Sequence, residues 1–113
     1  FESGFQAGEK IFSSAEQPTA IFASNDSMAA GVMKSAQMKK ILIPDDLSIV
    51  GFDDSPTAEQ VWPSLSTVKQ PVNEMALHAA KLLIGEFDGL TEKTVSKEFK
   101  SEIIIRESLK KLN

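Results

Sequence analysis

Two polar residues, each placed directly after a short apolar run, have the chemistry to hold a ligand that carries hydroxyl groups. Asn25 follows the run 20–24, and Asp53 follows the run 47–52. A carboxylate accepts two strong hydrogen bonds, while an amide both donates and accepts, so the pair suits neighbouring hydroxyls. A purely structural interpretation also fits, because Asn25 is a favoured helix cap and one member of the Asp53–Asp54 pair could cap a helix after Pro56. The residues alone leave both interpretations open.

The side chains needed for catalysis or metal binding do not form a recognisable set. His78 is the only histidine and lies on the polar side of a helical pattern, which indicates a solvated surface position. A single histidine without a neighbouring nucleophile makes no catalytic triad, and the glycine motifs of phosphate-binding loops do not occur. The absence of cysteine excludes disulfides and thiolate metal sites. We therefore expect a binding protein that is not an enzyme and uses no cofactor or metal.

The composition bounds the size of the fold and the class of partner. The chain has 113 residues, of which 42% are hydrophobic and 25% are charged, enough for one core. Its net charge of −4 opposes direct binding to nucleic acid. No apolar run approaches the roughly 20 residues of a membrane-spanning helix, so we expect no membrane partner. The first residue, Phe1, already lies in a helical pattern, and we expect the chain to be a piece of a longer protein.

The apolar patterns predict a fold in which helices and strands alternate. Helical spacing indicates three main helices and a short one, over 1–16, 26–38, 72–87 and about 57–60. Short apolar or alternating runs indicate strands over 20–24, 47–52, 65–69, 94–99 and 102–106, followed by a frayed or helical tail. This order predicts an α/β fold with a parallel or mixed sheet flanked by helices. Open sheets of this kind bind ligands at the edge where their parallel strands end.

Four segments resemble motifs of the LacI/GalR-type bacterial transcriptional regulators. They occur in the order found in that family and extend over most of the chain: PTAIFASNDSMAAG at 18–31, IPDDLSIVGFDD at 43–54, PSLSTVKQP at 63–71 and IIIRES at 103–108. The resemblance implies the C-terminal part of an effector-binding domain with the periplasmic-binding-protein-like type I fold. It further implies a cytoplasmic repressor whose DNA-binding head and nearly all of whose amino-terminal lobe lie outside this chain.

The resemblance also implies how the chain is organised. Residues 1–70 would belong to the C-terminal lobe of the effector-binding domain. Residues 71–100 would pack in the amino-terminal lobe, and residues 101–113 would return to the C-terminal lobe. Gln70 and Pro71 would be the crossing point between lobes, and Pro71 is also well placed as the first residue of a helix.

For function, the resemblance implies a small-molecule effector, expected to be a sugar, that Asn25 and Asp53 contact between the lobes. It implies a homodimer formed through Ala30, Met33, Val61 and Trp62. A tryptophan in a loop is also often partly buried beneath that loop, which is the structural alternative for Trp62. Operator DNA would be bound only through the head. We expect the isolated chain to bind no operator and to self-associate through the uncovered apolar face of the helix 72–87.

Two other function classes fit parts of the sequence. A fragment of a periplasmic sugar-binding receptor would share the fold and the Asn-Asp motif. A receiver-like phosphoacceptor domain would use Asp53, Asp54 and Lys69, and its acidic side chains would hold Mg²⁺. A receiver begins with a strand, whereas this chain begins with a helical pattern, and this difference disfavours the receiver.

Overall fold

The computed structural model describes residues 1–85 and 96–112, which fall into two units. Unit 1 consists of Phe1–Lys69 together with the segment that starts at Ile103. Unit 2 is the intervening stretch Gln70–Glu102. The two boundaries lie close to the lobe boundaries expected from the sequence. That unit 2 packs in another lobe stays a prediction.

The sheet of unit 1 is centred on two strands that pair in parallel across an intervening helix. Strand β1 (Ala20–Phe22) pairs in parallel with β2 (Ser48–Val50), with Ile21 opposite Ile49. A parallel bridge between Val50 and Ser66 links β2 to the start of β3 (Thr67–Lys69), which pairs with β4 (Glu102–Ile104). The α/β class and the parallel sheet expected from the sequence are confirmed.

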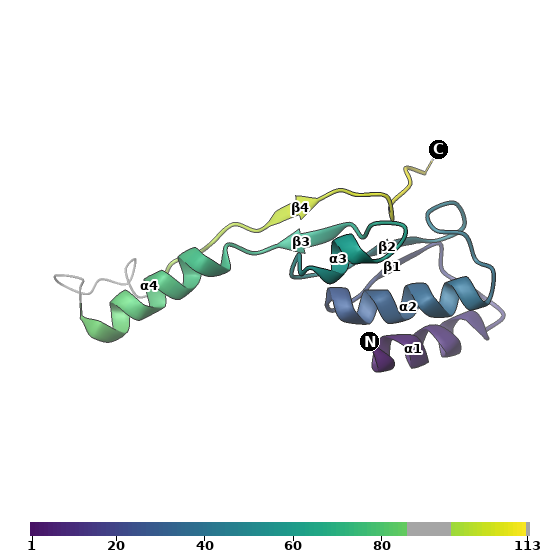
Figure 1. Ribbon diagram of the computed structural model, residues 1–113, viewed down its shortest axis with the longest axis horizontal. Coiled ribbons are helices and arrows are strands. Elements are labelled where there is room, and N and C mark those ends of the chain that lie inside the picture. Colours follow the sequence, from purple (N-terminus) through teal and green to yellow (C-terminus); the bar gives the residue numbers. More distant parts are fainter. Residues whose placement is uncertain (86–95, 113) are drawn as a thin grey trace. The chain divides into compact units, whose positions relative to one another are not determined.

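Helices α1 (Glu2–Phe12) and α2 (Asp26–Met38) lie side by side in unit 1 (Figure 1). Their backbones approach so closely that a Cβ atom on Gly31 would collide with the backbone of Phe1 and Phe5. Helix α2 also packs on β2 and on the short helix α3 (Thr57–Gln60). The core of the unit joins these helices to the strands, and its fully buried apolar side chains are Ala29, Met33, Ala36, Leu47, Ile49, Ala58 and Leu65.

The C-terminal segment after β4 is hydrogen-bonded to the sheet of unit 1. Ser108 is completely buried. Its hydroxyl donates to the carbonyl of Ile49 at 2.6 Å and accepts from the amide of Ser66 at 2.8 Å. The amide of Ile49 in turn donates to the carbonyl of Ser108 at 2.9 Å. One small polar side chain therefore joins β2 to the residues that lead into β3.

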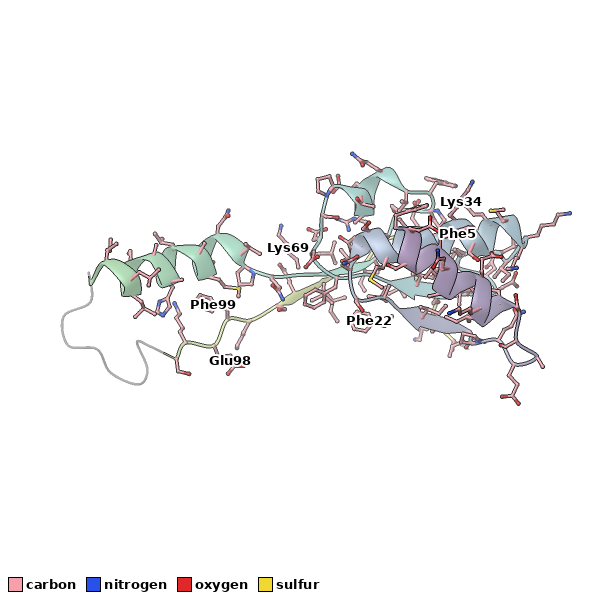
Figure 2. The ribbon with its side chains drawn as sticks, turned by 90° about the horizontal axis from the view of Figure 1, so that it is seen from below. Phe5, Phe22, Lys34, Lys69, Glu98 and Phe99 are labelled. Carbon is pink, nitrogen blue, oxygen red and sulfur yellow. The ribbon has the colours of Figure 1, made fainter. Side chains whose placement is uncertain are left out.

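Unit 2 contains α4 (Val72–Ile84) and the described residues that follow it. Helix α4 ends at Gly85, whose φ of 71° is left-handed and suits glycine. No residue of α4 is buried. Figure 2 shows Phe99 beside this helix, where its ring meets His78 edge-on with the centroids 5.7 Å apart. None of the helices in the described residues is long and apolar enough to cross a membrane.

Several elements differ from the sequence expectation. Helix α1 stops at Phe12, because the hydroxyls of Ser13 and Ser14 donate to carbonyls of its last turn. Residues 96–99 form no strand, since Phe99 packs on α4 instead; positions 94 and 95 lie outside the described residues, as does the predicted helix end at 86–87. The described tail is not helical, because buried Ser108 anchors it to the sheet.

Candidate functional site

The carboxyl ends of β1 and β2 bring two short polar segments to one edge of the sheet. The amide of Ala23 donates to the carbonyl of Val50 at 2.8 Å, and the amide of Asp26 donates to the carbonyl of Phe52 at 3.0 Å. These bonds continue the parallel register beyond both strands. Asn25 and Asp53 therefore lie at the same edge, as expected for residues that follow neighbouring parallel strands.

Asn25 is the N-cap of α2. Its backbone is extended, and its side-chain Oδ1 accepts a hydrogen bond from the amide of Met28 at 2.8 Å. The capping interpretation is thus confirmed. Among the described residues the Nδ2 group of Asn25 has no hydrogen-bond partner. The cap uses the acceptor of this amide and leaves its donors available, so a contact to a ligand stays a prediction that the geometry permits.

Asp53 and Asp54 form the turn after β2, and both have left-handed backbone angles, with φ values of 106° and 53°. Asp53 is exposed, and its carboxylate pairs with none of the described residues. Asp54 is half-buried and forms ion pairs with Arg106 at 2.7 Å and Lys69 at 3.7 Å. The expectation that one of the two aspartates caps the helix after Pro56 is wrong, because α3 begins without a side-chain cap and Asp54 is turned towards Arg106.

Asp26 stabilises this edge of the sheet through hydrogen bonds of its buried side chain. Its side chain is buried, with 1% of its surface exposed. Oδ2 accepts from the amide of Ser55 at 2.7 Å, and Oδ1 accepts from the hydroxyl of Thr67 at 2.5 Å. The carboxylate lies so close to Gly51 that a Cβ atom there would collide with it. No local sequence pattern indicates this role, because the partners of Asp26 lie 29 and 41 positions away.

An exposed aromatic side chain lies at the end of β1, near this edge of the sheet. Phe22 of β1 is 66% exposed, and its ring meets that of Phe52 edge-on with the centroids 6.5 Å apart. Figure 2 labels Phe22. The edge therefore combines an amide, an unpaired carboxylate and an apolar neighbour, which together suit a small polar molecule with an apolar face.

The four residues predicted to form a dimer interface line one shallow groove of about 190 Å³. Trp62 is 75% exposed, and its carbonyl accepts a hydrogen bond from the Gln37 side chain at 2.9 Å. The alternative that Trp62 lies beneath its loop is therefore wrong. Met33 is almost fully buried and belongs to the core as well. The complete lining is Phe1, Ala30, Met33, Lys34, Gln37, Val61 and Trp62.

Gln70 and Pro71 lie at the start of unit 2, directly after the boundary with unit 1. Pro71 is the N-cap of α4 and not its first helical residue, which corrects the sequence expectation by one position. The amide of Val72 donates to the carbonyl of Gln70 at 2.9 Å. The predicted crossing between lobes at this point stays a prediction.

Within residues 1–85 and 96–112, no three acidic or histidine side chains gather closely enough to hold a metal ion. His78 contacts the ring of Phe99, so it is not simply solvated. Lys69 lies beside Asp54, but Asp54 already has Arg106 as its closer partner. In the part of the chain that the structure describes, this edge offers hydrogen-bond donors and acceptors to a ligand.

Residues 2–109 match the family model described as a periplasmic binding protein-like domain. The sequence is 42% identical to a probable HTH-type transcriptional repressor, ExuR, of Bacillus subtilis over 98% of this chain and 33% of that protein. It is 42% identical to the ribose operon repressor of Halalkalibacterium halodurans over 80% of this chain and 27% of that protein. The chain thus spans about a third of the length of these relatives.

Solved structures of the same kind share the fold. A sugar-binding LacI-family regulator from Escherichia coli in complex with phosphate matches with a TM-score of 0.83 and 36% identity, over 95% of this chain and 38% of that one. A LacI-family regulator from Lactobacillus casei with bound glucose matches with a TM-score of 0.77 and 32% identity, over 95% of this chain and 38% of that one.

Proposed function

Because the chain belongs to the periplasmic-binding-protein-like effector domains of LacI-type regulators, we propose that it binds a small hydroxylated effector and forms a homodimer. It catalyses no reaction. Operator DNA is bound through a separate head of the parent protein, and the parent acts in the cytoplasm. The relatives named as repressors support this function over a periplasmic receptor or a phosphoacceptor domain.

One observation carries the ligand part of the proposal. The parallel register of β1 and β2 brings Asn25 and Asp53 to a single edge, and the Asp53 carboxylate is left unpaired by the described residues. The amide of Asn25 donates to a hydroxyl oxygen, while Asp53 accepts from one or two hydroxyls. Charge-assisted bonds of this kind are about twice as strong as neutral ones, so Asp53 supplies most of the affinity of the two. The related regulator that binds glucose supports a sugar as the ligand class.

The experiment is a binding titration of the full-length parent protein with D-glucose, D-ribose and lactose by calorimetry. Asp53→Asn keeps the shape of the side chain and tolerates the left-handed backbone, but removes the charge. A lost charged hydrogen bond costs about 1.5–3 kcal/mol, which corresponds to roughly a ten- to hundredfold weaker affinity. The matched control is Asp45→Asn. Asp45 precedes β2, and this substitution removes its exposed ion pair with Lys110. Equal affinities for Asp53→Asn and the wild type would contradict the ligand assignment.

Trp62 tests the dimer part of the proposal. An exposed tryptophan over a shallow apolar groove is typical of a residue that anchors an interface. We expect Trp62→Ala to raise the dimer dissociation constant by more than about tenfold, which sedimentation equilibrium of the parent protein would measure. Phe22→Ala removes another exposed aromatic ring that does not line the groove, and it should leave the dimer unchanged. A Trp62→Ala protein that dimerises as tightly as the wild type would refute this assignment.

A further inference from the structure

The turn that carries Asp53 has a conformation that needs support from its surroundings. Asp53 and Asp54 are consecutive non-glycine residues with positive φ values. Each such residue is held at an energetic cost that neighbouring contacts must offset. The turn therefore keeps its shape only because other residues fix it, and the identity of those residues decides how Asp53 is presented.

Arg106 supplies the strongest of these contacts to the Asp54 side chain. One guanidinium nitrogen donates to Asp54 Oδ1 at 2.7 Å, and the other donates to the carbonyl of Leu65 at 2.9 Å. The side chains of Arg106 and Asp54 are only 15% and 14% exposed, so water weakens this pair little. The planar guanidinium makes the two bonds from separate nitrogens in a fixed fork, a geometry that the single nitrogen of a lysine does not reproduce.

Other contacts to the turn are weaker or hold its backbone. Lys69 lies 3.7 Å from Asp54, and its side chain is 56% exposed, so solvent screens this pair. Glu59, 3.4 Å from Arg106, is 77% exposed. The backbone of the turn is held by three acceptors: the carbonyl of Val68 accepts from the amide of Asp53 at 2.9 Å, the hydroxyl of Thr67 accepts from the amide of Asp54 at 3.4 Å, and Asp26 accepts from the amide of Ser55. Among the described residues, Arg106 is thus the only half-buried cation that pairs with the Asp54 carboxylate.

We propose that Arg106 is a positioning residue of the ligand site: by binding Asp54, it keeps the turn in the left-handed conformation that leaves Asp53 free for the ligand. The inference rests on the proposed function, since it assigns a role in effector binding. Arg106 does not touch the ligand. It comes two residues after β4, so the segment that returns from unit 2 sets the geometry of the turn after β2.

The first arm of the test needs no ligand. Hydrogen exchange of the peptide that covers residues 53–56 is measured in the full-length parent protein for the wild type, Arg106→Lys, Arg106→Met and Lys110→Met. We expect exchange of these amides to rise by roughly tenfold in Arg106→Met, to rise less in Arg106→Lys, and to stay unchanged in the control. The control removes a long cation whose partner, Asp45, is exposed. Unchanged exchange in Arg106→Met would overturn the inference, whether or not the protein binds a sugar.

The second arm measures affinity for whichever of D-glucose, D-ribose or lactose binds the wild-type protein most tightly. Arg106→Met should weaken binding by about tenfold or more, and Arg106→Lys should weaken it less. In the background of Asp53→Asn, Arg106→Met should have little further effect, because the group that Arg106 positions has already lost its charge. A merely structural role predicts the same fold loss in both backgrounds, and that result would overturn the inference.

The two arms separate the inference from the function on which it rests. If none of the three sugars binds, or if Asp53→Asn binds as well as the wild type, the proposed ligand site fails. The exchange arm then still decides whether Arg106 holds the turn. If sugar binding depends on Asp53 but not on Arg106, the function stands and the positioning role is refuted.

Discussion

Ser108→Ala tests how much one buried hydroxyl contributes to stability by holding the C-terminal segment against β2 and the residues before β3. The hydroxyl bridges the carbonyl of Ile49 and the amide of Ser66, and no part of Ser108 reaches solvent. The substitution removes one oxygen atom and leaves a buried amide and a buried carbonyl without this partner. No other hydrogen bond from the Ser66 amide is available among the described residues.

The expected loss of stability follows from these two orphaned groups. A buried polar group left unsatisfied costs about 1–3 kcal/mol, and the volume removed with the oxygen is small. Since Ile49 and Ser66 are both inside the sheet, we expect the free energy of unfolding to fall by about 2–4 kcal/mol. That is a large share of the roughly 5–15 kcal/mol by which domains are usually stable.

Urea-induced unfolding of the chain, followed by far-ultraviolet circular dichroism, measures this loss. The control is Ser101→Ala, since Ser101 is exposed and makes no hydrogen bond with the described residues. We expect the midpoint of Ser108→Ala to fall with an unchanged slope, and the control to behave as the wild type. A loss below about 0.5 kcal/mol, within the range of ordinary surface substitutions, would refute the reasoning.

Three further predictions follow from other parts of the structure. Gly51→Ala should lower the urea midpoint, because the added Cβ would collide with the buried Asp26 carboxylate. Overpacking of this kind costs about 1–3 kcal/mol. A midpoint equal to that of the wild type would contradict this prediction. The hydrogen bond from Ser35 and the ion pair with Lys39 hold the pKa of Glu9 below its ordinary value of 4.5. The stability that Glu9 contributes is therefore present above pH 4.5 and is lost as the pH falls through the lower folded value. The difference in urea midpoint between wild type and Glu9→Gln should shrink as the pH is lowered below 4.5, and a difference that stays constant on acidification would argue against it. The isolated chain should self-associate because no residue of α4 is buried, and light scattering that shows a monomer at high concentration would rule this out.

The local part of the fold could be predicted from the sequence because its causes are local. Asn25 caps α2 as its residue type indicates, and α3 lies where the sequence after Pro56 predicted it. The parallel pairing of β1 and β2 follows from two short apolar runs separated by a helix. The family resemblance carried the rest of the assignment, and the matching family model and relatives confirm it.

The contacts that shape the candidate site could not be predicted, because they join residues far apart in the chain. Asp54 and Arg106 are separated by 52 positions, and no periodicity or spacing rule connects them. Asp26 has the same residue type whether it caps a helix or is buried, and only the fold brings Thr67 to it. Left-handed angles at Asp53 and Asp54 are likewise imposed by these distant partners, since aspartate alone only tolerates such a conformation.

The bridge made by Ser108 has a consequence for synthesis on the ribosome. Ile49 and Ser108 are 59 positions apart, with all of unit 2 translated between them. At roughly 5–20 residues per second, several seconds pass between the emergence of β2 and that of its last neighbour. During this interval, the part of β2 that contacts the final segment in the folded chain is uncovered. The amide and the carbonyl of Ile49 gain their hydrogen bonds to Ser108 only when the final segment arrives.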